Sequence, residues 1–237
     1  AQNFTGYKNL MKLVTAGYLE GFYYRPRIDM ELLRQYSEGL ICLSGCLKGE
    51  VPERMLNGDY EGAKNTALMF SEIFPDRYYL EIQNHGIPEE EKNIQNMKKL
   101  SSELGLPLVC TNDAHYAKKD HWEAHDIHIC LGTGKERSDP KRLRYATPEF
   151  YFKSQDDMFH LFKEFPEAIE NTRKIADSID LTLPIGESHL PNFPIPSSSA
   201  TQDPDDYLRL LTEKGAMSLY GDLTPDIKGR IGHELKV

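Results

Sequence analysis

Residues 106–115, LPLVCTNDAH, carry the clearest structural signal of the chain and its clearest chemical signal side by side. The mostly apolar run Leu106–Thr111 is typical of a strand in a parallel sheet that is covered on both faces. Asn112, Asp113 and His115 follow where that strand is expected to end. Functional groups of parallel α/β folds gather at the carboxyl ends of strands. The stretch therefore predicts an α/β fold with a site at one edge of its sheet.

Two similar strand-then-helix units precede this one. Each joins a short apolar or β-rich run to a longer segment with helical periodicity. We expect strands over 40–43, 77–82 and 106–111, each followed in turn by a helix over roughly 59–74, 89–104 and 119–131. This alternation predicts parallel strands joined by right-handed crossovers. Periodicity alone fits a doubly wound sheet and a barrel equally well.

The rest of the chain divides at a stretch rich in proline and serine. We expect helices over roughly 7–18, 154–164, 166–179, from 205 onward, and 224–235. Residues 183–204 contain the proline and serine cluster and are predicted to be an extended linker. The predicted organisation is a first domain over 1–182, the linker over 183–204 and a helical segment over 205–237. Because helix 7–18 starts with nothing ahead of it to pack against, we also expect a domain that lacks its first part.

The composition of the chain indicates which classes of protein it can belong to. The chain has 237 residues, a net charge of −9 and four cysteines, with no apolar run long enough to span a membrane and no signal peptide. These features predict a cytoplasmic protein with reduced thiols. No cluster of Lys and Arg is present, so we expect any contact with nucleic acid to use neighbouring regions or bound cations.

Side chains that bind metals stand at all three expected strand ends. Cys46 follows the first strand, Glu81 and His85 belong to the second, and Asp113 and His115 follow the third. Thiolate, carboxylate and imidazole groups are the ligands of zinc and related divalent metals. Alternate residues of an extended segment point the same way, so Asp113 and His115 are predicted to share a metal. The alternative is that Asp113 caps the next helix and His115 is a surface imidazole.

The other candidates have stronger structural alternatives. A buried, inert thiol is the commonest state of a cysteine such as Cys46. His85 is interpreted as a turn residue in preference to a metal or phosphate group. His121 and His125 are four residues apart and have the spacing of a chelating pair, and His128 lies one turn further on. A solvated helix face is the favoured interpretation for at least two of these three.

The segment FYYRPRID, residues 22–29, carries a basic group among aromatic side chains. Arg25 and Arg27 are therefore candidates for contact with phosphate. Ordinary packing with salt bridges is the more frequent alternative. The chain has no nucleophile elbow, no Walker A loop and no dinucleotide-binding glycine pattern.

Several motifs together resemble the PHP (polymerase and histidinol phosphatase) domain of bacterial DNA polymerase III alpha subunits. They are GYKNLMKLV from residue 6, GFYYRPRID from 21, LSGCLKGEVP from 43, YYLEIQNHG from 78, CTNDAHY from 110, EAHDIHICLGTGK from 123 and EFYFKS from 149. The tail, with YLRLLTEKGAMSLYG from 207, resembles the segment that leads from that domain toward the polymerase core. The resemblance covers nearly the whole chain.

The resemblance implies an irregular (β/α)7 barrel with divalent metals, such as zinc, manganese or magnesium, at its carboxyl rim. Matched motif by motif, it implies Cys46, Asp113 and His115 as metal ligands. The residue types themselves, and not the resemblance, make Arg27, Glu81, His85 and His125 possible rim or phosphate groups. The family's remaining ligands belong to motifs expected ahead of residue 1. We therefore expect an incomplete barrel that lacks its first strands and holds a remnant of the metal site.

The resemblance also implies a place in DNA replication, within a DNA-directed DNA polymerase (a nucleotidyltransferase). One hypothesis is a metal-dependent phosphoesterase or 3′–5′ exonuclease site; the alternative is a non-catalytic scaffold that braces the polymerase and docks a proofreading subunit. A stand-alone phosphatase fits the polymerase-like tail poorly. The implied partners are DNA, the proofreading subunit and the sliding clamp. We expect the isolated chain to lack polymerase activity, to have little nuclease activity and to self-associate through its open barrel.

Overall fold

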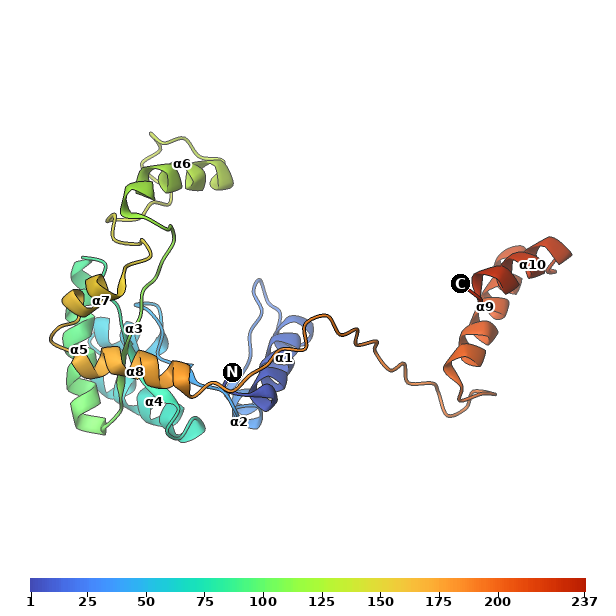
Figure 1. Cartoon of the computed structure of the whole chain (residues 1–237), viewed down its shortest axis with the longest axis horizontal. Helices are drawn as coiled ribbons and strands as arrows, with labels where there is room; N and C mark the ends of the chain where they lie inside the picture. Colours follow the sequence, from blue (N-terminus) through green and yellow to red (C-terminus); the bar gives the residue numbers. More distant parts are fainter. The chain divides into compact units, whose positions relative to one another are not determined.

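The computed structural model describes all residues, 1–237, and the chain separates into two compact units. The first unit comprises residues 1–183 and the second comprises residues 184–237. The first is a mixed α/β unit that contains a small sheet and most of the helices (Figure 1). No helix of either unit is long and apolar enough to cross a membrane.

The sheet of the first unit has three strands in the order β1-β2-β3. They are β1 (Cys42–Leu43), β2 (Tyr78–Ile82) and β3 (Leu108–Cys110). Both pairings are parallel, with Cys42 opposite Tyr78 and Ile82 opposite Cys110. The prediction of parallel strands is therefore confirmed, and the three carboxyl ends lie at one edge of the sheet.

Helices account for most of the remaining structure. In the first unit they are α1 (Phe4–Leu19), α2 (Met30–Gln35), α3 (Glu50–Leu56), α4 (Tyr60–Ile73), α5 (Pro88–Leu104), a 3-10 turn (Lys119–His121), α6 (Trp122–Thr133), α7 (Gln155–Leu161) and α8 (Pro166–Asp177). All the expected helices are present. The short helices α2 and α3 were not expected, because six or seven residues hold too little periodicity to be recognised.

Helix α5 shows how local signals set the crossover between β2 and β3. Pro88 stands in its first turn with Glu89, Glu90 and Glu91, which favour the positive end of the helix dipole. Gly105 ends the helix in the left-handed conformation, with φ of +68°. The chain then enters β3 within a few residues, so β2 and β3 are held in register by a helix with defined ends.

The core of the first unit forms between the sheet and its helices. Leu80 and Ile82 of β2 are fully buried, and so are Ala63 and Ala67 of α4 and Met97 and Leu100 of α5. Helix α8 covers β3, and the buried Asn171 donates from Nδ2 to the carbonyl oxygen of Leu108 at 2.7 Å. The sheet is therefore held against α5 and α8.

The second unit is a pair of helices, α9 (Pro204–Tyr220) and α10 (Pro225–Glu234), preceded by residues that form neither helix nor strand. Asp203 caps α9 by accepting from the backbone N–H groups of Asp205 and Asp206. Phe193, in the extended stretch, stacks against Tyr207 of α9 with ring centroids 5.9 Å apart. Most apolar side chains of this helix pair remain exposed, with Ala216 the one buried residue of α9.

Candidate functional site at the carboxyl edge of the sheet

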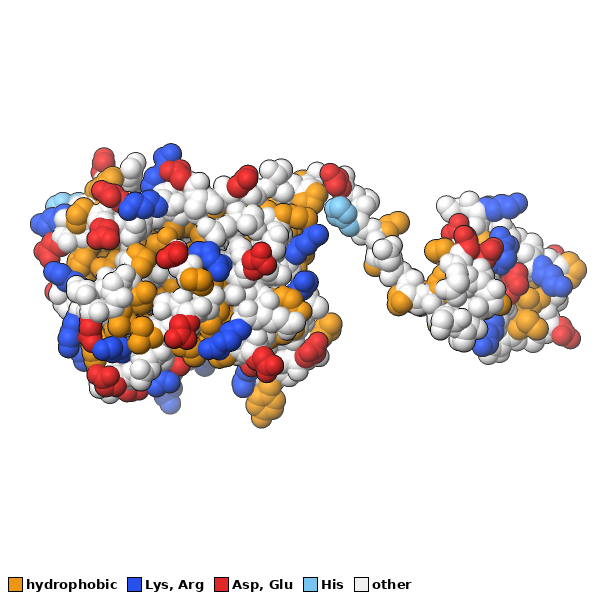
Figure 2. Space-filling model, turned by 90° about the horizontal axis from the view of Figure 1, so that it is seen from below, with side chains coloured by type: hydrophobic (Ala, Val, Ile, Leu, Met, Phe, Trp, Pro, Cys, Tyr) orange, Lys and Arg blue, Asp and Glu red, His pale blue; other side chains and the backbone are white.

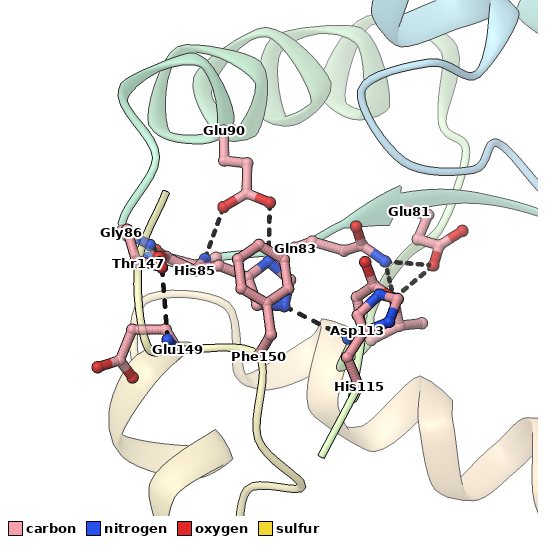
Figure 3. Close-up of polar contacts among 12 residues, drawn as sticks. Glu81, Gln83, His85, Gly86, Glu90, Asp113, His115, Thr147, Glu149 and Phe150 are labelled. Carbon is pink, nitrogen blue, oxygen red and sulfur yellow. Dashed lines mark hydrogen bonds and ion pairs between the residues drawn. The ribbon is translucent and has the colours of Figure 1, made fainter. Parts of the chain in front are cut away.

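The carboxylate of Glu81, near the end of β2, joins the ends of all three strands. Figure 3 shows it beside Gln83. Its Oε2 accepts from the backbone N–H of Gly45 at 3.1 Å, just after β1. Its Oε1 accepts from the hydroxyl of Thr111, just after β3, and from Nε2 of Gln83 at 3.3 Å. The side chain is 8% exposed. Glu81 thus lies at the expected rim, but its oxygens are already bonded within the protein.

His85 lies in the connection from β2 to α5 with its imidazole buried, 1% exposed. Its Nδ1 is 2.8 Å from Oε1 of the buried Glu90, and its backbone N–H donates to Oε2 of the same carboxylate at 2.6 Å. The backbone N–H of Asp113 donates to Nε2 at 3.4 Å. This contact assigns the ring proton to Nδ1. The chain turns at Gly86, with φ of +73°, and the imidazole next to this turn is buried.

The ring of His85 also stacks on Phe150, with centroids 4.3 Å apart and planes 3° apart. The hydroxyl of Thr147 donates to the backbone carbonyl of His85 at 2.6 Å. Phe150 in turn accepts, through its carbonyl oxygen, from the backbone N–H of His115 at 2.8 Å. His85 therefore ties the end of β2 to two later segments, the one after β3 and the one around residues 147–150 (Figure 3).

Asp113 and His115 meet, as their spacing predicts. Oδ1 of Asp113 lies 3.1 Å from Nε2 of His115, and the two side chains are 43% and 35% exposed. The hydroxyl of Tyr145 lies 3.0 Å from Nδ1 of His115 and 3.1 Å from Nε2. A carboxylate and an imidazole thus lie together at an accessible point just past β3.

His125 of α6 extends this group. Its ring centroid lies 6.0 Å from that of His115, 5.1 Å from Tyr116 and 5.3 Å from Tyr145. Partial burial, together with the nearby imidazoles of His115 and His128, lowers the pKa of His125 below its ordinary value. His121 and His128 are exposed, in agreement with a solvated helix face for two of the three histidines.

The lowered pKa of His125 predicts a pH dependence of folding. The unfolded chain, with an ordinary histidine pKa of about 6.5, takes up a proton first as the pH falls. The contribution of His125 to the free energy of unfolding is therefore at its full value above about pH 6.5. It decreases as the pH falls below that value. His125→Asn should lose less stability than the parent chain between pH 7 and pH 5, measured by urea unfolding. An equal loss in both proteins would contradict the prediction, and His121→Asn, at an exposed site, serves as the control.

Two predicted site residues do not join the group around Asp113 and His115. Cys46 is exposed in the turn after β1. No group of three or more His, Cys, Asp or Glu side chains in the structure is arranged to hold a metal ion. Arg27 lines an apolar pocket with Leu40 and Ile41, before β1 begins, and so lies at the opposite end of that strand from the candidate site.

Residues 1–85 match the family model described as "PHP domain". The chain is 46% identical over its full length to the DNA polymerase III subunit alpha of Borreliella burgdorferi, covering 21% of that protein. It is 43% identical over its full length to the subunit of Treponema pallidum, covering 20%, and 40% identical over 94% of its length to that of Thermus aquaticus, covering 18%. The chain thus spans about one fifth of the length of these curated relatives.

Proposed function

The chain belongs, over its whole length, with bacterial DNA polymerase III alpha subunits, and from that premise we propose that it works in DNA replication as the PHP-containing part of a replicative DNA-directed DNA polymerase. The observation that carries the proposal is the 46% identity that extends across both units of the chain. DNA, a proofreading subunit and a sliding clamp are the proposed partners, and the cytoplasm is the proposed place of action.

The finer form of the fold that we propose is part of a PHP-type barrel. The PHP match covers β1 and β2, and the sheet continues in parallel to β3. β1 pairs with β2 alone, so its other edge is open to a further strand. A closed barrel needs such a neighbour, because an unpaired edge exposes backbone donors and acceptors. The same open edge supports the proposal that the isolated chain self-associates.

Asp113 and His115, just after β3, are the pair that we propose as metal ligands, with Cys46 as a third candidate after β1, on the far side of β2. Carboxylate and imidazole suit zinc, manganese or magnesium to different degrees, and a thiolate favours zinc. The residues present do not fit a complete centre, since only the first two meet and zinc sites use three or four protein ligands. These residues therefore do not make up a hydrolytic metal centre by themselves.

A scaffold role is the second candidate function, and one observation favours it. The most buried polar groups at the carboxyl edge already form hydrogen bonds with other parts of the chain. They are Glu81, His85 and Glu90. Such groups organise loops and leave few free atoms for a substrate. We propose that this edge orders the segments around Asp113 and Thr147 whether or not a metal binds there.

Primer extension tests the proposed function. The natural protein that carries this chain should incorporate deoxynucleoside triphosphates on a primed template, whereas the isolated chain of residues 1–237 should incorporate none. Absence of synthesis by the natural protein would refute the proposal. A nuclease assay on the isolated chain should give little or no product, and a metal-dependent rate abolished by Asp113→Asn would show instead that the pair belongs to a working hydrolase.

A further inference from the structure

The loop between α1 and α2 is a tight hairpin with a strained residue at its tip. The backbone N–H of Tyr23 donates to the carbonyl of Arg25 at 3.1 Å, forming an isolated antiparallel bridge. Tyr24, between them, has φ of +59°. A bulky residue rarely adopts this conformation, and strain of this kind concentrates at functional positions. In Figure 1 the loop projects beyond α1.

The base of the hairpin is fixed by close backbone packing on α1. A Cβ atom at Gly21 would stand 2.0 Å from the carbonyl oxygen of Arg27, and one at Gly17 would stand 3.4 Å from the same oxygen. Gly21 therefore allows the backbone at Arg27 to lie directly against the end of α1. Asp29 then caps α2 by accepting from the backbone N–H of Leu32 at 2.8 Å. The tip is thus held out from two anchored helices.

The tip presents aromatic rings to solvent. Tyr24 is 82% exposed and Tyr23 is 63% exposed, with their centroids 4.6 Å apart in an edge-on arrangement. At the base, the exposed rings of Tyr18 and Phe22 stack with centroids 6.3 Å apart. Figure 2 shows that hydrophobic side chains also reach the surface elsewhere on the first unit. In the hairpin the rings are followed in the sequence by two arginines.

Neither arginine of the hairpin has an acidic partner. No carboxylate lies within 4.0 Å of the guanidinium of Arg25 or Arg27, so the expected packing with salt bridges does not occur. Arg27 lies over the ring of Tyr23, 5.2 Å from its centroid. On its other side Arg27 lines a pocket with Glu20, Asp29 and Glu31, which would repel an anion. Arg25, next to the tip, does not line that acidic pocket.

We propose that this hairpin, residues 22–27, binds single-stranded DNA, with bases stacking on Tyr23 and Tyr24 and a phosphate contacting Arg25. Single strands offer the faces of their bases, whereas a duplex hides them within its own stack. The hairpin carries two positive charges and no negative one, although the chain as a whole has a net charge of −9. The inference rests on the proposed function for the choice of DNA as ligand. It concerns a surface distinct from the Asp113–His115 pair.

Fluorescence anisotropy with a labelled oligothymidylate of about 15 nucleotides tests the inference at low salt, using the whole chain. Tyr24→Gly is the decisive variant, because glycine suits the positive φ and so removes the ring without harming the fold. It should weaken binding about tenfold while unfolding no earlier in urea. Arg25→Ala should lower the slope of log K against log salt by about 0.7, the value for one phosphate contact on a single strand.

Matched controls distinguish binding at the hairpin from nonspecific binding of DNA elsewhere on the chain. Tyr220→Ala and Arg173→Ala remove an exposed ring and an exposed guanidinium elsewhere and should leave binding unchanged. An abasic oligomer and a duplex should both bind more weakly than oligothymidylate. The inference is overturned if the parent chain does not bind, if Tyr24→Gly binds as the parent does, or if abasic and thymidine oligomers bind equally. If the hairpin variants lose binding but the natural protein shows no primer extension, the proposed function is refuted. The hairpin remains a binding site for single-stranded DNA in that case.

Discussion

Replacing Glu90 with alanine is expected to destabilise the first unit by about 2–6 kcal/mol, because each of two buried donors left unpaired costs about 1–3 kcal/mol. The carboxylate accepts from Nδ1 and from the backbone N–H of His85, and both partners are almost fully buried. Alanine would leave two buried donors without an acceptor. Urea unfolding followed by circular dichroism measures the loss.

The neighbouring glutamates supply the controls for this result. Glu89→Ala and Glu91→Ala alter exposed side chains in the same helical turn and should change stability by no more than about 0.5 kcal/mol. Glu90→Gln should fall between these and alanine, because the amide accepts one hydrogen bond but turns its NH₂ toward the second donor. If Glu90→Ala cost no more than the exposed controls, the buried pair would not be the support that we describe.

Gly6→Ala is the second substitution with a large expected effect. Gly6 of α1 lies against the backbone of Gly39, and a Cβ atom there would stand 1.9 Å from the Gly39 carbonyl oxygen. That oxygen also accepts from the backbone N–H of Gln2 at 2.8 Å. Relief of the clash would require α1 to move from the segment that leads into β1. We expect a loss of about 3 kcal/mol, at the upper end of the usual range for overpacking.

Gly132 provides the matched control, since it lies in α6 of the same unit and a Cβ atom there would meet nothing within 4 Å. Gly132→Ala should be neutral or stabilise by up to about 1 kcal/mol, because alanine favours the helix. A Gly6→Ala variant as stable as Gly132→Ala would show that α1 is not docked as closely as the structure indicates.

The sequence was sufficient for the parallel sheet and for the meeting of Asp113 with His115. Both follow from short-range rules, the alternation of strands with helices and the two-residue repeat of an extended segment. The relation between Arg27 and the sheet edge could not be predicted in this way. It depends on the close packing of Gly21 against the Arg27 backbone, which turns the segment toward the beginning of β1.

The support beneath the candidate site was not predictable from local pattern. Glu90 is one of three acidic residues at the start of α5. The helix dipole alone accounts for acidic residues there, so the sequence gives no sign of a further role for Glu90. Its partnership with His85, and the stacking of that ring on Phe150, join segments distant in the chain. Nothing in the spacing of His85 and Phe150 marks them as neighbours. Burial of polar groups is decided by tertiary packing, and packing is the part that periodicity does not contain.

Equilibrium dialysis against zinc tests the central claim, that Asp113 and His115 are a metal-binding pair, most directly. Because only two of the proposed ligands meet, the parent chain should bind zinc weakly, and a double variant Asp113→Ala, His115→Ala should bind less at the same zinc concentration. Cys46→Ser, measured beside it, tests the third proposed ligand. The exposed pair Asp120 and His121, 3.9 Å apart, is the matched control, and replacing both by alanine should leave zinc binding unchanged. Equal zinc content in the parent chain and the Asp113, His115 double variant would contradict the claim.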